Sequence, residues 1–290
     1  MPAVASPSVR KDAADRGIDL EALATRLGRQ TLAKEDLVAA TSAPGAASTG
    51  PWEADHAAHG PVRSEPVSRF AQLAAQTLGA AQTVIPAVTH HDKADVTALE
   101  AFRASLKKEA TERGVKLTAL AFHVAALAHC LERFERFNAS LSADGQSLIL
   151  KDYIHVGIAV DTPHGLMVPV VRDVADKGLW QIAEEIADLA TRANARKVRP
   201  EEMGGASMSI SNLGGIGGDA FTPMVNPPEV AILGLTRVET VPVWDGAAFV
   251  PRPMVPLHLT YDHRVVNGAD AARFLRAYAD LIADPRRLLV

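Results

Sequence analysis

The stretch VPLHLTYDHRVVNG, residues 255–268, decides how the fold is interpreted, because it joins a strand to a helix through a polar turn. The apolar run at 255–261 predicts a buried strand, and Asn267-Gly268 is a turn signal after which a helix begins. His263 lies where that strand ends. An imidazole on a rigid scaffold is suited to act as a general base, although a lone histidine is more often an ordinary turn residue.

Helices and strands alternate upstream of this stretch. Apolar residues at spacings of three and four predict helices from Asp95 to Gly114, from Thr118 to about Glu135, from Leu179, and from Ala269. Strand-like runs lie between them at 154–160, 166–171, 207–211 and 229–235. The pattern predicts an α/β domain in which helices cover a mixed sheet.

Two glycine-containing segments stand out inside this pattern. SISNLGGIGG, residues 209–218, leads from a short strand with hydroxyl groups into a glycine-rich loop, where backbone can approach a ligand closely. It matches neither a Walker loop nor a Rossmann fingerprint, so by itself it predicts a ligand loop or a simple turn equally well. GIAVDTPHGLMVPV, residues 157–170, predicts a hairpin with its turn at 162–165.

Composition shifts divide the chain into three zones. Patterning is continuous over residues 66–290, which we expect to form one domain. Residues 41–65 are rich in Ala, Gly, Ser and Pro without a hydrophobic period, which is typical of a flexible linker. Residues 5–40 predict a small helical unit, with helices from Arg10 to Arg16 and from Lys34 to Ala40.

Bulk properties exclude several classes of function. The 290 residues carry a net charge of −4, without a basic patch for nucleic acid or a membrane surface. The single cysteine, Cys130, fits a reducing compartment, and with no signal peptide at the start we expect a cytoplasmic protein. His90-His91 lack partners at metal-ligand spacing, and Lys93 lacks the small β-domain of a lipoyl lysine.

Taken in order, the motifs resemble those of dihydrolipoyl acyltransferases, a family whose structural relative is chloramphenicol acetyltransferase. The resemblance covers residues 66–290 and is closest to the pyruvate dehydrogenase branch of the 2-oxo acid dehydrogenase complexes. It rests on the hairpin and the glycine-rich segment quoted above, and on FNAS at 137–140, TPMVNPPEVAILG at 222–234 and DHRVVNGADAARF at 262–274. The resemblance implies a chloramphenicol acetyltransferase-like fold and transfer of an acyl group, in this branch acetyl, between dihydrolipoamide and coenzyme A.

The resemblance also implies roles for individual residues. His263 would be the general base, Ser211 would donate its hydroxyl to the oxyanion, and Asn267 would help to hold the turn of the histidine. Asn267 departs from the commonest family pattern, which has aspartate there, and asparagine lacks its charge. The residues implied to contact coenzyme A are Asn212, Gly214, Gly215 and Arg264.

Partners are implied in the same way. The family forms homotrimers that assemble into larger cages, with the histidine and the serine contributed by neighbouring subunits. Residues 5–40 resemble the peripheral subunit-binding domain, which binds other subunits of the complex, although Thr31 stands where the family has its partner-contacting arginine. No lipoyl domain is recognisable, so we expect the lipoyl group to be supplied in trans, with no metal needed.

Two alternatives stay open on the sequence. A non-catalytic scaffold subunit would explain the missing lipoyl domain and Asn267, although both His263 and Ser211 are retained. A small-molecule acyltransferase that uses acyl-CoA would also work without a lipoyl arm.

Overall fold

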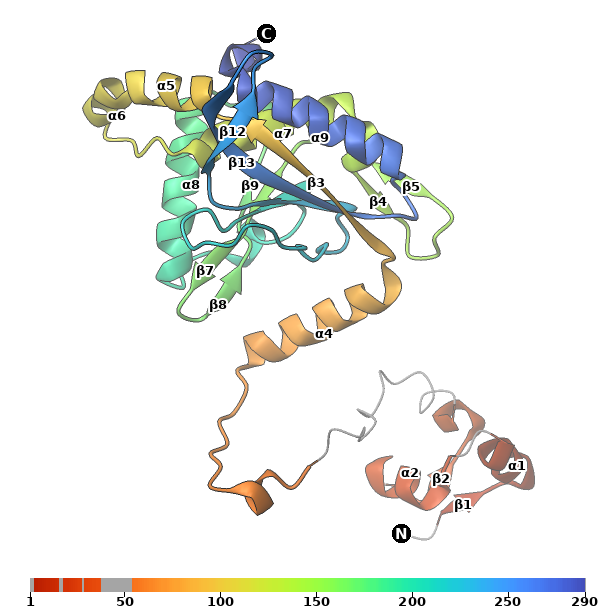
Figure 1. Ribbon diagram of the computed structural model, residues 1–290. Helices are drawn as coiled ribbons and strands as arrows, with labels where there is room; N and C mark the ends of the chain where they lie inside the picture. Colours follow the sequence, from red (N-terminus) through yellow and green to blue (C-terminus); the bar gives the residue numbers. More distant parts are fainter. Residues whose placement is uncertain (1–2, 16–17, 28, 38–53, 290) are drawn as a thin grey trace. The chain divides into compact units, whose positions relative to one another are not determined.

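The computed structural model describes residues 3–15, 18–27, 29–37 and 54–289 (Figure 1). Contacts between Cα atoms divide the chain into two units, Met1–Pro66 and Val67–Val290. Most of the expected linker, residues 38–53, lies outside the described residues. Of the rest, residues 56–59 form a single turn, η1 (His56–His59), which Asp55 caps through its carboxylate.

The first unit is a small helical module with its own core. It contains α1 (Pro7–Asp15), α2 (Leu20–Leu27) and a parallel pair of two-residue strands, β1 (Val4–Ala5) and β2 (Thr31–Leu32). The buried residues are Val9, Ala13, Leu23, Ala24, Leu32 and Leu37. The first helix begins three residues before the predicted Arg10. The helix α2 was not predicted; it begins where the Asp19 carboxylate accepts the backbone N–H groups of Glu21 and Ala22.

A seven-stranded mixed sheet forms the centre of the second unit. Its strand order is β12-β13-β11-β10-β6-β9, and β3 pairs with the long strand β13. Strand β10 runs parallel to β11 and β6, whereas the other pairs are antiparallel. The strands are β3 (Ala87–Asp95), β6 (Val156–Ile158), β9 (Val170–Val171), β10 (Met208–Asn212), β11 (Ala231–Leu235), β12 (Glu239–Trp244) and β13 (Phe249–Asp262). The expected mixed sheet covered by helices is confirmed.

The two faces of the sheet differ in chemistry. One face packs on α7 (Ala119–Arg133) and α9 (Gly268–Ala283) through apolar side chains, among them Leu257, Leu259 and Tyr261 (Figure 1). The opposite face carries the alternate residues of the same strands. Its buried members include Ser209, His258 and Thr260, and we call it the polar face.

The remaining helices flank this sheet. α8 (Leu179–Asn194) contacts α7, and α4 (Arg69–Val84) packs its last turn on Val225 and Ile232. The helix predicted from Asp95 to Gly114 is split at Leu106 into α5 (Thr97–Ser105) and α6 (Lys107–Arg113). Neither α4 nor β3 was predicted. Within the described residues, no helix is long and apolar enough to cross a membrane.

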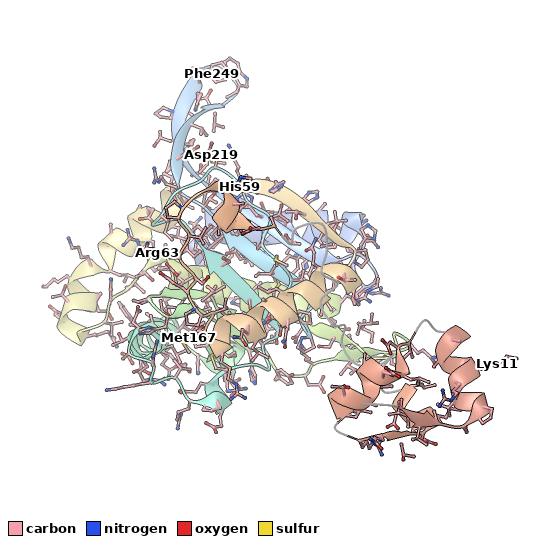
Figure 2. The ribbon with its side chains drawn as sticks, turned by 90° about the horizontal axis from the view of Figure 1, so that it is seen from below. Lys11, His59, Arg63, Met167, Asp219 and Phe249 are labelled. Atoms are coloured by element: carbon pink, nitrogen blue, oxygen red, sulfur yellow. The ribbon has the colours of Figure 1, made fainter. Side chains whose placement is uncertain are left out.

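Three two-stranded hairpins extend from the sheet and its helices. The predicted turn at 162–165 joins β7 (Val160–Thr162) to β8 (Gly165–Met167), while the flanking strands β6 and β9 belong to the main sheet. β4 (Ala139–Leu141) pairs with β5 (Leu148–Leu150). The hairpin of β12 and β13 projects outward, with Phe249 at its tip (Figure 2).

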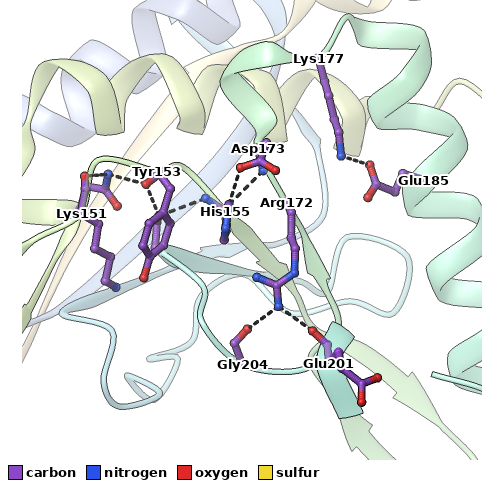
Figure 3. A network of polar contacts seen from close by, with 11 residues as sticks. Lys151, Tyr153, His155, Arg172, Asp173, Lys177, Glu185, Glu201 and Gly204 are labelled. Atoms are coloured by element: carbon purple, nitrogen blue, oxygen red, sulfur yellow. Dashed lines mark hydrogen bonds and ion pairs between the residues drawn. The ribbon is translucent and has the colours of Figure 1, made fainter. Parts of the chain in front are cut away.

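The loop that leads into β10 is held by polar contacts with the end of β9 (Figure 3). Arg172 Nη2 donates to the carbonyl oxygens of Glu201 at 2.6 Å and Gly204 at 3.4 Å. Next to it, the backbone N–H of Asp173 donates to His155 Nδ1 at 2.9 Å. These contacts fix the point at which β10 enters the sheet, and therefore the position of Ser211 near its end.

Candidate active site

His263 lies in the turn between β13 and α9. Its backbone N–H donates to the carbonyl oxygen of Pro86 at 3.1 Å, which fixes the turn against the start of β3. The side chain is exposed, and its ring lies 5.8 Å from the ring of the buried Tyr261. No hydrogen bond to its ring nitrogens forms within the described residues, so both nitrogens are available to a ligand.

The neighbours of His263 form an ion pair that supports the turn. Asp262, only 3% exposed, receives two bonds from Arg264 Nε, at 3.0 and 3.1 Å, and one from Arg264 Nη2 at 2.6 Å. The hydrogen bond to Asp262 raises the pKa of Arg264. Much of the guanidinium is therefore committed within the chain, and contact between Arg264 and coenzyme A stays a prediction.

Asn267 is the N-cap of α9. Its Oδ1 accepts the backbone N–H of Asp270 at 2.9 Å, and its Nδ2 donates to Asp270 Oδ2 at 2.7 Å. In the part of the chain that the structure describes, no hydrogen bond joins Asn267 to His263. Asn267 therefore holds the start of α9, and its role toward His263 stays a prediction.

Ser211 stands near the end of β10, at the entrance of the glycine-rich loop. Its side chain is half-buried and forms no hydrogen bond within the described residues. The following turn is closed by Asn212 Oδ1, which accepts the N–H of Gly214 at 2.9 Å. A Cβ on Gly214 would stand 3.0 Å from that oxygen and 3.3 Å from the carbonyl oxygen of Thr236, whereas Gly215 faces open space. The loop geometry thus favours glycine at position 214 through close contacts, and at positions 217 and 218 through their positive φ angles of 142° and 92°.

The register of the sheet separates Ser211 from His263 within one chain. The N–H of Asp262 donates to Val230, one residue before β11, and in β10 Ser209 pairs with Ile232. Ser211 is therefore four residues further along the strands than Asp262, and two strands away. This places them roughly 13 Å apart along the strands and roughly 10 Å across. The two candidate residues are therefore well separated within one chain, and we call their positions the two half-sites.

Glu229 is a candidate residue that the sequence analysis missed. It is 5% exposed and lies two residues before β11, and its Oε1 accepts from Ser209 Oγ at 2.9 Å and Asn226 Nδ2 at 3.0 Å. Burial raises its pKa to about 7. It lines a cavity of about 310 Å³ together with Asp262 and Arg264. The sequence did contain a signal for this residue, because Glu229 directly precedes the apolar run VAILG, and a carboxylate next to a buried strand is a candidate buried group.

Two further polar residues considered in the sequence, Cys130 and Lys93, lie within regular elements. Cys130 is buried in α7, where desolvation raises its pKa to about 12, so the thiol is inert at neutral pH. Lys93 lies in strand β3. Among the described residues, no group of three or more His, Cys, Asp or Glu side chains is placed to hold a metal ion.

Comparison with protein families gives one match over most of the chain. The model of the 2-oxoacid dehydrogenases acyltransferase catalytic domain matches residues 59–290. The dihydrolipoyllysine-residue acetyltransferase component of the pyruvate dehydrogenase complex of Azotobacter vinelandii is 46% identical, over 99% of this chain and 47% of that protein. The same component from Pseudomonas aeruginosa is 46% identical, over 99% of this chain and 55% of that protein. The chain thus spans about half the length of the curated relatives it matches.

Solved structures agree with this match. Dihydrolipoamide acetyltransferase of Azotobacter vinelandii has a TM-score of 0.81 at 49% identity, over 82% of this chain and 98% of that chain. That structure was solved to investigate the role of a serine, a histidine and an asparagine in its catalytic mechanism. The cubic core of the pyruvate dehydrogenase multienzyme complex gives a TM-score of 0.81 at 50% identity, with the same coverage. The expected fold is confirmed.

Proposed function

Since the chain belongs to the family of 2-oxoacid dehydrogenase acyltransferases, we propose that it transfers an acetyl group between dihydrolipoamide and coenzyme A. The choice of acetyl is supported by its relatives, which are acetyltransferase components of pyruvate dehydrogenase complexes. One observation carries the assignment of the site. The serine, histidine and asparagine investigated in the Azotobacter vinelandii enzyme have the same separations along the chain as Ser211, His263 and Asn267.

In the proposed mechanism, His263 is the general base. A free thiol is mostly protonated at neutral pH, and the thiolate is the nucleophile. The neutral imidazole takes the proton of the coenzyme A thiol, and the thiolate attacks the carbonyl carbon of acetyl-dihydrolipoamide. As the new C–S bond forms, the carbonyl electrons move to oxygen, where the Ser211 hydroxyl donates a hydrogen bond. The bond to the lipoyl sulfur then breaks, and that sulfur takes the proton from the imidazolium.

This mechanism needs more than one copy of the chain. Ser211 and His263 of one chain lie too far apart to act on one carbonyl, because the sheet register fixes their separation. We therefore propose a homotrimer in which the serine of one copy meets the histidine of the next. Assembly of trimers into a cage is supported by the similarity to a cubic core.

The remaining partners belong to the same proposal. Coenzyme A and a lipoyl arm supplied in trans are the substrates, and residues 5–40 would contact other subunits of the complex. In the small helical module, Thr31 is exposed on β2, so the position of the family's contacting arginine is accessible but uncharged. A cytoplasmic location stays a prediction, supported by the bacterial relatives.

The test is acetyl transfer from acetyl-CoA to free dihydrolipoamide by the purified protein. Replacement of His263 by Ala is expected to lower the rate by about 10²–10⁴-fold, the usual contribution of a positioned general base. His59→Ala is the matched control, because His59 is exposed on η1 and precedes the unit Val67–Val290 that carries His263 and Ser211. Absence of turnover in the wild-type protein would contradict the proposal, and would favour a scaffold subunit or another acyl acceptor.

A further inference from the structure

A row of aligned residues crosses the polar face of the sheet at the level of Ser211. Ser211 is the register partner of Gly234, Gly234 of His258, and His258 of His91. Register partners on neighbouring strands point to the same face. His91, on the edge strand β3, is therefore on the same face as Ser211, three strand spacings or roughly 14 Å away.

The hydrogen bonds along this row determine the protonation of both histidines. Thr236 has one hydroxyl proton, which it donates to the carbonyl oxygen of Asp219 at 3.2 Å. His258 Nε2, also 3.2 Å from that hydroxyl, must then be the donor to it. His258 is 2% exposed, and burial, followed by the charge of His91, lowers its pKa to about 4, so it is neutral at pH 7.

A neutral imidazole that carries its proton on Nε2 has an unprotonated Nδ1, which can only accept a hydrogen bond. His258 Nδ1 lies 2.8 Å from His91 Nδ1, so His91 must donate its Nδ1 proton to His258. In its neutral form His91 then keeps a bare Nε2. The His91 ring is exposed, and the hydrogen bond to the buried His258 fixes its orientation and its tautomer. Functional histidines in other proteins are commonly oriented by such a partner.

We propose that His91 is a substrate-binding residue, whose Nε2 accepts a hydrogen bond from an amide N–H of the thiol-bearing arm that reaches Ser211. This inference rests on the proposed function. Both arms, the pantetheine part of coenzyme A and the lipoyl amide, are uncharged chains with secondary amides, which a bare imidazole nitrogen recognises without an ion pair. An arm of about four residue lengths spans roughly 14 Å when extended, which matches the distance between Ser211 and His91. Such an arm passes over the ring of Phe221, which covers Gly234 and lies 5.4 Å from the ring of His258.

Two variants at this position separate binding from structure. In His91→Asn the shorter amide stays near the place of Nδ1, so it keeps the donor to His258 and removes the exposed acceptor. In His91→Gln the longer amide reaches the place of Nε2, so it keeps an exposed acceptor and gives up the donor. We expect the Asn variant to bind its substrate three- to tenfold more weakly with an unchanged kcat, and the Gln variant to be closer to wild type in binding.

Two readouts identify the arm. Calorimetry with coenzyme A reports binding without turnover, and the KM values for acetyl-CoA and dihydrolipoamide are measured separately. Weaker coenzyme A binding in the Asn variant assigns the contact to pantetheine, whereas a rise only in the KM for dihydrolipoamide assigns it to the lipoyl amide. An Asn variant with wild-type Kd and both KM values unchanged overturns the proposal. A wild-type protein that binds its substrates without transferring acetyl overturns the proposed function alone, and calorimetry of the two variants with coenzyme A and with dihydrolipoamide still decides the role of His91.

Discussion

At the scale of single residues, Ser211 is the most direct test of the chemistry. Its hydroxyl is half-buried and forms no hydrogen bond within the described residues, so it is available to a developing oxyanion. Ser211→Ala is expected to lower kcat by about 10²–10³-fold, which is the effect of removing one such donor. Steady-state kinetics measure this, with size-exclusion chromatography to verify unchanged assembly. Full activity in the variant would remove Ser211 from the mechanism.

Glu229 makes a prediction about pH and stability. Burial raises its folded-state pKa to about 7, above an ordinary value of 4.5, so the folded state holds the proton more tightly than the unfolded state. Stability therefore falls as pH rises from about 4.5 through 7, by up to roughly 3 kcal/mol once the carboxyl is ionised.

Glu229→Gln removes this dependence, because the neutral amide keeps an acceptor for Ser209 and Asn226. Denaturant unfolding of both proteins at pH 5 and pH 8.5 measures the effect. The variant should gain stability relative to wild type at the higher pH and little at the lower one. Equal differences at the two values would show that Glu229 does not titrate in this range.

At the scale of elements, Asn267 controls the start of α9. Its carbonyl oxygen caps the helix through the N–H of Asp270, and removal of an N-cap costs about 0.5–2 kcal/mol. Asn267→Ala should lower the free energy of unfolding by that amount. Asn267→Ser is the control, since serine is also a good N-cap, and it should restore most of the loss. An Ala variant as stable as wild type would mean that the cap is dispensable.

The elements differ in how well local sequence predicts them. α7 lies within two residues of its predicted ends, because its apolar residues keep a helical period and are buried. β3 was missed because its central residues, His90 to Lys93, are polar and show no alternation. That strand forms through pairing with β13, in which His91 and His258 are 167 residues apart in the chain, and no local pattern encodes such a contact.

The candidate site, like the fold, could be predicted only where local sequence patterns determine it. The strand-end positions of Ser211 and His263 follow from local patterns, since strand and turn signals flank both residues. The pairing of His91 with His258 and the burial of Glu229 depend on sheet register and on packing of distant segments, which single-residue patterns do not contain.

At the scale of the whole molecule, the separation of the two half-sites predicts complementation between inactive chains. Co-expressed Ser211→Ala and His263→Ala chains would form mixed trimers. In a mixed trimer, a His263→Ala chain can supply the intact Ser211 to a neighbouring Ser211→Ala chain that supplies the intact His263. With equal amounts and random assembly, about one quarter of the sites would be intact, so about a quarter of the wild-type activity should return. As a control, the two variants are purified separately and then mixed under conditions in which subunits do not exchange, and this mixture should stay inactive. If co-expression restores nothing, both residues must act within one chain, which the register of β10, β11 and β13 does not allow without a rearrangement of the sheet.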